Sequence, residues 1–79
     1  MEKIMLQLDL SGLACPMPII KLKKLLAENP ELVEWFEVQV SDPGALRDIP
    51  AYCRQQGLAY RLQQEAPVIK FHLRRVQSV

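Results

Sequence analysis

The spacing of the hydrophobic side chains is the feature that most limits how this chain can fold. Apolar and polar residues alternate in some segments, which is typical of half-buried strands. In other segments apolar residues recur three and four positions apart, which is typical of one face of a helix. Taken in order, the segments predict strand, helix, strand, helix, strand, strand. Few topologies bury all of these apolar faces together, so the order indicates the fold class.

The same patterns predict where each element lies. Pro50 fits best in the first turn of a helix, so the second helix is expected to begin with Asp48 as its N-cap, after a looser entry at residues 45–47. Its buried face is expected to contain Leu46, Ile49, Tyr52 and Cys53. Strands are predicted at residues 4–10, 35–40, 58–63 and 69–74, and helices at residues 16–28 and 48–56.

The connections between these elements predict the architecture. A right-handed crossover makes the first two strands parallel, and a short turn near Pro67 makes the last two an antiparallel hairpin. Both helices then cover one face of a four-stranded mixed sheet, and the other face stays polar. The expected fold is α+β, a two-layer α/β sandwich of order βαβαββ. With 79 residues and no linker or repeat, the chain is expected to be a single domain spanning residues 1–79.

Charge and hydropathy argue against nucleic acid and membrane as direct partners. Ten Lys and Arg residues against nine Asp and Glu residues leave a net charge of +1, whereas proteins that neutralise phosphates carry a larger basic excess. No apolar run approaches the roughly 18 residues of a transmembrane helix. The first residues alternate in polarity and no small-residue cleavage site follows them. We therefore expect no membrane insertion and a cytoplasmic location.

Cys15 is the strongest candidate for chemistry. It lies where the first strand ends and the first helix begins, after Gly12, which permits a sharp turn. Pro16 and Pro18 follow it and restrict the backbone around the sulfur. Free N–H groups and the macrodipole at a helix N-terminus favour a thiolate over a thiol, so this position predicts a reactive cysteine. The alternative is a small apolar residue that fills a corner of the core.

The other cysteine and the histidine are expected to be structural. Cys53 lies at helical spacing from Ile49, which predicts a buried packing residue rather than a resolving cysteine. His72, the only histidine, is expected on the solvent-facing side of the last strand, with no Cys-His relay. Two cysteines and one histidine do not form the ligand pattern of a zinc site. We therefore expect no metal and no cofactor.

Charged side chains near the predicted helix starts are candidates for partner binding: Lys21, Lys24, Asp42 and Arg47. The lysines, together with Lys23, would attract an acidic partner surface or help to hold a thiolate. The plainer interpretation makes the lysines the solvated face of the helix, and makes Asp42, Arg47 and Asp48 caps and surface ion pairs. Trp35 is predicted either to anchor a partner or to pack against the sheet edge.

Two separated sequence blocks resemble the TusA/SirA-like family of small sulfur-carrier proteins. Residues 12–18, Gly-Leu-Ala-Cys-Pro-Met-Pro, match the Gly-x-x-Cys-Pro-x-Pro segment that opens the first helix of that family. Residues 41–43, Ser-Asp-Pro, and residues 47–53, followed by Gly57, are similar to the family's second block, an Asp-Pro turn before an Asp-Ile-Pro helix. Together with the βαβαββ order, the resemblance spans about residues 6–73.

The resemblance implies a sulfur relay centred on Cys15. The thiolate would accept a terminal sulfur as a persulfide from a donor protein, such as a cysteine desulfurase or a rhodanese, and pass it to an acceptor protein. Such a carrier is a sulfurtransferase in the broad sense rather than a stand-alone enzyme, and it needs an exposed sulfur but no deep pocket. Family members serve tRNA thiolation, molybdenum-cofactor maturation, sulfur oxidation, thiosulfate uptake and selenium handling, so the resemblance leaves the pathway open.

Two other functions remain as alternatives. The first is a non-catalytic regulatory or binding module that uses the lysine-bearing helix and the open sheet face, with Cys15 as a structural or redox-sensing residue. The second is RNA binding by the open sheet face. It is disfavoured because the outward positions of the strands hold no paired aromatic residues.

Overall fold

The computed structural model describes residue 4, residues 6–14 and residues 17–76. Its elements follow the order predicted from the hydrophobic spacing, so that prediction is confirmed. Neither of the helices in the described ranges has the length and apolar character needed to cross a bilayer. The elements are β1 (Gln7–Asp9), α1 (Met17–Glu28), β2 (Phe36–Val40), α2 (Ala45–Gln56), β3 (Leu58–Gln64) and β4 (Ile69–Arg75).

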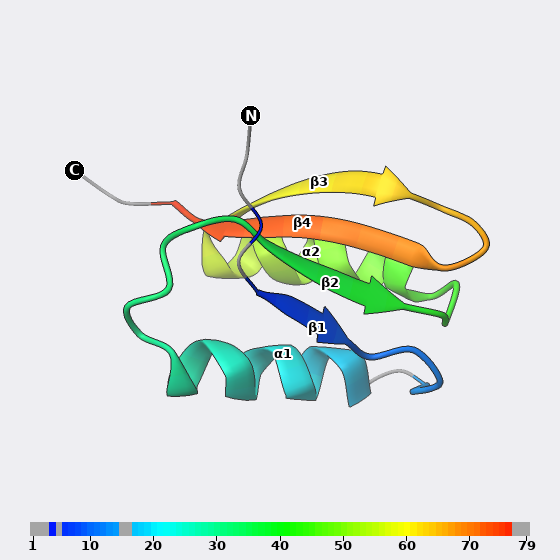
Figure 1. Cartoon of the computed structure of the whole chain (residues 1–79), viewed down its shortest axis with the longest axis horizontal. Helices are drawn as coiled ribbons and strands as arrows, with labels where there is room; N and C mark the ends of the chain where they lie inside the picture. Colours follow the sequence, from blue (N-terminus) through cyan, green and yellow to red (C-terminus); the bar gives the residue numbers. More distant parts are fainter. Residues whose placement is uncertain (1–3, 5, 15–16, 77–79) are drawn as a thin grey trace.

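The strands form a mixed sheet in the order β1-β2-β4-β3 (Figure 1). β1 pairs with β2 in parallel, with Leu8 opposite Val38, and β2 pairs with β4 in antiparallel, with Val38 opposite Phe71. β3 and β4 form the predicted antiparallel hairpin, in which Tyr60 lies opposite Leu73. The chain passes from β1 through α1 to the neighbouring parallel strand, which is the crossover that the sequence predicts.

An apolar cluster lies between the sheet and both helices. β2 alternates between buried and partly buried residues, and Phe36, Val38 and Val40 are fully buried. Leu22 of α1 and Ile49 of α2 belong to the same cluster and are also fully buried. Burial of each of these side chains contributes about 1.5–3 kcal/mol to folding. Because both helices pack on the side chains of one sheet face, the predicted two-layer α+β arrangement is confirmed.

α2 begins earlier than predicted, with Gly44 rather than Asp48 as its N-cap. Asp48 donates its N–H to the carbonyl of Gly44 at 2.9 Å, so it already lies inside the helix. Pro50 therefore lies in the second turn, where its missing N–H removes the usual helical donor to the Leu46 carbonyl. The carbonyls of residues 42–43, in the preceding turn, accept N–H groups of the first helical turn at 3.0 and 3.1 Å, so two donors that usually lack a partner at a helix start are paired.

The earlier start also changes which side chains α2 buries. The prediction that Leu46 is buried is wrong, since this side chain is 39% exposed. Ala45 takes the inward position instead, one helical turn before Ile49, and both are buried. Tyr52 and Cys53 are buried as predicted.

Candidate functional site

The loop after β1 and the loop after β2 lie at the same end of the sheet (Figure 1). β1 and β2 are parallel, so their carboxyl ends meet at this edge, and α1 and α2 both begin from it. The β1–α1 loop, residues 10–16, contains the candidate cysteine, and the β2–α2 loop comprises residues 41–44. This edge therefore brings together the two sequence blocks that carry the family resemblance.

Two hydrogen bonds join the β1–α1 loop to the end of β2. The N–H of Gly12 donates to Oγ of Ser41 at 2.7 Å, and the N–H of Leu10 donates to the carbonyl of Gln39 at 2.7 Å. Ser41 was not predicted as a site residue, because a bond between residues 29 positions apart leaves no signal in local spacing. The two bonds hold the loop in a fixed position relative to the sheet.

Gly12 makes the sharp turn that the sequence predicts. Its φ is +86°, in the left-handed region where glycine is favoured. The N–H of Leu13 donates to the carbonyl of Leu10 at 3.3 Å across this turn. No atom within 4 Å would contact a Cβ added at Gly12, so a substitution there would strain the backbone rather than crowd its neighbours. Gly12 therefore supports the loop through its backbone.

Asp9 stabilises the same turn with its carboxylate. Its Oδ1 accepts the hydroxyl of Ser11 at 2.5 Å and the N–H of Ser11 at 3.0 Å. These two hydrogen bonds, the hydroxyl first, hold the pKa of Asp9 below its ordinary value of 3.8. The carboxylate is therefore ionised at neutral pH and places a negative charge at this edge of the sheet.

Cys15 and Pro16 lie outside the described residues, whereas their neighbours are described. The carbonyl of Ala14 accepts the N–H of Met17, the first residue of α1, at 2.9 Å. Pro18, predicted to support the loop, is fully buried in the first turn of α1. That turn contains no acidic residue, so it does not neutralise the positive end of its own helix dipole. The N-terminus of a helix without such a residue favours a nearby thiolate, and the reactivity of Cys15 stays a prediction.

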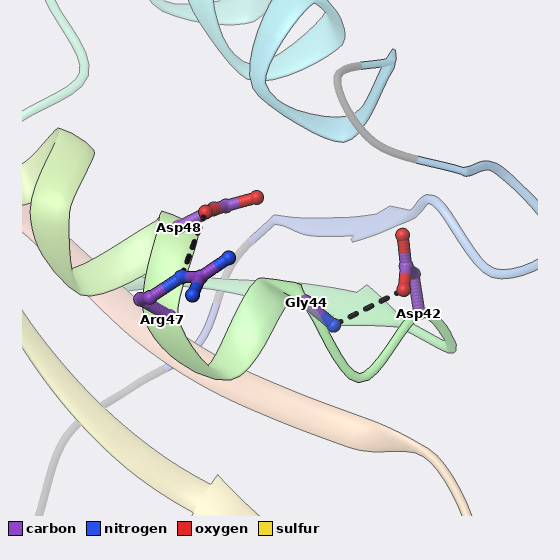
Figure 2. Close-up of polar contacts among 4 residues, drawn as sticks. All are labelled: Asp42, Gly44, Arg47 and Asp48. Carbon is purple, nitrogen blue, oxygen red and sulfur yellow. Dashed lines mark hydrogen bonds and ion pairs between the residues drawn. The ribbon is translucent and has the colours of Figure 1, made fainter.

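Figure 2 shows the charged side chains at the start of α2. Oδ1 of Asp42 accepts the N–H of Gly44 at 3.1 Å, which closes an Asx turn just before α2 and does not cap the helix itself. Nε of Arg47 lies 3.8 Å from Oδ1 of Asp48, and the Arg47 side chain is 88% exposed. An ion pair this exposed contributes little to stability. Partner binding by Asp42 and Arg47 stays a prediction.

Lys21 and Lys24 are both exposed on α1. Residues three positions apart are neighbours on a helix surface, so the two ammonium groups belong to one side of α1. Their exposure fits a solvated helix face and also leaves them accessible to a partner protein. A role of these lysines in partner binding stays a prediction.

Cys53 has the buried position predicted for it. Its side chain is fully buried in α2, among the core residues. Burial raises the pKa of the Cys53 thiol to about 12, and the positive charge of Arg54 opposes this effect only in part. A thiol with this pKa is almost entirely protonated at neutral pH, so Cys53 is a packing residue rather than a nucleophile.

His72 lies on the predicted face of β4, but it is less exposed than expected. Only 14% of its side chain is accessible, and Nε2 lies 3.2 Å from Oε1 of Glu37 on the neighbouring strand. The register places Glu37 directly opposite His72, and this pairing cannot be read from either strand alone. Within the described ranges, no three His, Cys, Asp or Glu side chains gather as a group that could hold a metal ion.

Proteins that are named as sulfur carriers resemble this chain over much of its length. It is 34% identical over 76 residues to YrkF of Bacillus subtilis, which bears the provisional name of a sulfur carrier protein, and the match covers 95% of this chain and 40% of YrkF. It is 39% identical over 51 residues to the sulfur carrier protein TusA of Allochromatium vinosum, covering 65% of this chain and 66% of that protein. The chain thus spans less than half the length of YrkF.

The fold and the whole sequence point to the same family. The crystal structure of a SirA-like protein from Desulfitobacterium hafniense superimposes with a TM-score of 0.75 and 25% sequence identity, covering 89% of this chain and 96% of that chain. The sequence matches the family described as sulfurtransferase TusA over residues 6–75. That range contains all six elements and both loops at the candidate site. The chain therefore belongs to the TusA family.

Proposed function

We propose that this protein is a sulfur carrier that holds a sulfur atom on Cys15 as a persulfide. The burial of Cys53 is the observation that carries the proposal. The chain has two cysteines, and Cys53 is fully buried with a pKa of about 12, so its sulfur is neither accessible nor nucleophilic at neutral pH. We therefore assign the sulfur chemistry of this member of the TusA family to Cys15.

Loading is a thiolate exchange at the terminal sulfur of a donor persulfide. The Cys15 thiolate attacks that sulfur, a bond forms between the two sulfur atoms, and the donor S–S bond breaks so that the donor leaves as a thiolate. In delivery, an acceptor thiolate attacks the terminal sulfur on Cys15 and the Cys15 thiolate is released. No oxidant or reductant is consumed, because the transferred sulfur keeps its oxidation state in both steps.

Proteins are the donor and the acceptor in this proposal, with a cysteine desulfurase or a rhodanese as the donor. The β1–α1 loop, which the bond between Gly12 and Ser41 holds in place, lies at the edge of the sheet. The exposed Lys21 and Lys24 belong to the helix that follows it. A residue on a loop held by a rigid scaffold is well placed to enter the active site of a larger partner.

Intact mass spectrometry tests the proposal directly. After incubation with a cysteine desulfurase and cysteine, the protein is expected to gain the mass of a sulfur atom. The gain should be absent in Cys15→Ser and present in the matched control Cys53→Ala, because the buried thiol of Cys53 is not available to a donor protein. Loading that survives Cys15→Ser and disappears with Cys53→Ala would overturn the assignment.

A further inference from the structure

Trp35 and two arginines form a cluster that the sulfur-carrier proposal does not use. The guanidinium carbon of Arg61 lies 4.6 Å from the centroid of the Trp35 ring, and that of Arg74 lies 4.9 Å from it. Both arginines are exposed, and Trp35 is partly buried. We call these three residues the arginine–tryptophan patch.

The strand register places the patch on the sheet face that the helices leave uncovered. Phe71 and Leu73 of β4 point into the core, so Arg74 points to the opposite face. Ala59 of β3 lies opposite Arg74, and its short side chain leaves room on this face. Trp35 directly precedes β2, and its ring reaches the guanidinium groups of two other strands.

We propose that the arginine–tryptophan patch is a docking surface for an acidic segment of a partner protein. A guanidinium stacked on an aromatic ring is held in one position, so less side-chain entropy is lost when it binds. Its N–H groups point outward in the guanidinium plane, where carboxylates bind. Trp and Arg are also enriched among the residues that contribute most to protein interfaces.

The charges around the patch favour an acidic occupant. Lys70 lies on the same face of β4 as Arg74, so it adds a third cation to the two arginines. Two carboxylates lie nearby and make contacts within the chain: Glu37 lies 3.2 Å from Nε2 of His72, and Glu34 accepts a backbone N–H at 3.4 Å. The three cations outnumber these two carboxylates. Electrostatic complementarity of this kind guides association and sets the orientation of a partner.

An acidic protein segment fits this surface better than single-stranded nucleic acid. Two guanidinium groups lie over the Trp35 ring, and they occupy the surface on which a base would stack. The chain has a single tryptophan and a net charge of +1, so it offers neither a row of stacking residues nor a strong attraction to phosphates.

The patch is remote from the β1–α1 loop. Trp35 precedes β2 and Ser41 follows it, so the strand separates these two residues by about 20 Å. A partner bound at the patch would leave the β1–α1 loop open to a second protein. The protein can therefore stay attached to one partner while its loop serves another.

Titration of the full chain with a short oligoglutamate peptide, followed by amide NMR spectra, tests this inference. We expect saturable shifts of the Trp35 indole N–H and of amides in β3 and β4, with α1 unchanged. The double variant Arg61→Gln/Arg74→Gln should weaken binding about tenfold or more, because it removes both stacked cations. The matched control Lys21→Gln/Lys24→Gln removes the same charge from α1 and should keep the wild-type affinity.

Three results would overturn the docking surface: shifts confined to α1, equal losses of affinity in the two double variants, or no saturable shift at all. Tighter binding of single-stranded oligouridylate than of the peptide would overturn it in favour of nucleic acid. Neither double variant touches Cys15. Persulfide loading of Arg61→Gln/Arg74→Gln, measured by intact mass, therefore separates a failure of docking from a failure of sulfur carriage.

Discussion

The two cysteines illustrate how position sets the reactivity of a thiol. Cys53 lies within α2 with no exposed surface, and removal of water from around the sulfur disfavours its thiolate. Cys15 precedes α1, whose first turn has no carboxylate, and a helix N-terminus of this kind favours a thiolate. The same side chain is therefore expected to act as packing at one position and as a nucleophile at the other.

Titration of Cys53 is expected to lower the stability of the folded state at alkaline pH. Its pKa rises from an ordinary value of 9.0 to about 12 on folding. Between these values the folded chain keeps a proton that the unfolded chain has released, so raising the pH favours unfolding. The stabilisation is complete below pH 9 and is lost across this window at up to about 1.4 kcal/mol per pH unit. Urea unfolding at a series of pH values measures the decline.

Cys53→Ala is the matched variant for this measurement. It removes the titrating thiol, so its free energy of unfolding should fall less steeply above pH 9 than that of the wild type. At neutral pH the variant should be less stable by about 1 kcal/mol, because it loses a buried sulfur atom. Burial is the larger cause of the raised pKa of Tyr52 and the charge of Cys53 is the smaller one, so Cys53→Ala keeps the part due to burial and removes only the part due to Cys53. Parallel declines in the two proteins would refute the role of Cys53.

α1 is held at its carboxyl end by a residue from the other end of the chain. Arg75, the last residue of β4, donates from Nη2 to the carbonyl of Leu26 at 2.6 Å. Its Nη1 donates to the carbonyls of Asn29 at 2.8 Å and Leu32 at 2.6 Å. The last turn of α1 contains no basic residue, so Arg75 supplies the cation that a helix C-terminus favours. These contacts fix α1, the helix that follows the β1–α1 loop, against the sheet.

Arg75→Gln is expected to lower the free energy of unfolding by about 1.5–3 kcal/mol, because three hydrogen bonds from a charged group to backbone carbonyls are lost. Arg75→Lys should recover only part of this loss, since one ammonium group cannot reproduce the fork of a guanidinium. Urea unfolding measures both variants, and amide hydrogen exchange should show the largest change in the last turn of α1.

Arg54→Gln is the matched control for Arg75→Gln. Arg54 donates to the hydroxyl of Tyr60 at 3.1 Å, but both residues are exposed. Its substitution should change the free energy of unfolding by less than about 0.5 kcal/mol. Equal losses in Arg54→Gln and Arg75→Gln would show that Arg75 contributes no more than a surface arginine.

The whole chain is expected to unfold as one unit. Fully buried residues from four elements share the core cluster: Leu22, Phe36, Ile49 and Leu73. The radius of gyration is 11.7 Å, compared with about 11.6 Å for a compact domain of this length. No element in the described part of the chain can therefore separate without exposing apolar surface of the others. A single domain over residues 1–79 stays a prediction.

Coincident unfolding transitions test that prediction. In urea, the fluorescence of Trp35 and the far-UV circular dichroism should change with the same midpoint and slope. Ile49→Val removes one buried methyl group and should lower the free energy of unfolding by about 0.5–1.5 kcal/mol in both signals. Separate midpoints, or a shift in only one signal, would show that the chain contains more than one cooperative unit.

The local spacing of hydrophobic residues was sufficient to predict much of the fold. Alternation and helical repeats predicted the element order, the parallel first pair, the hairpin and the burial of Cys53. It misplaced the start of α2, because the helix begins at Ala45, where N–H groups of its first turn donate to carbonyls of the preceding turn, and Pro50 lies in its second turn. Because α2 begins at Ala45, Leu46 lies on the surface and not on the buried face.

The sequence by itself determined which segments form strands and helices and which faces they bury, because those properties depend on neighbours a few residues away. Only the tertiary structure decided the partners of individual side chains. The bond from Gly12 to Ser41 and the contacts of Arg75 with the end of α1 join residues far apart in the chain. So does the stacking of two arginines on Trp35. Such contacts depend on how strands pair and helices pack, so the spacing of hydrophobic residues does not predict them.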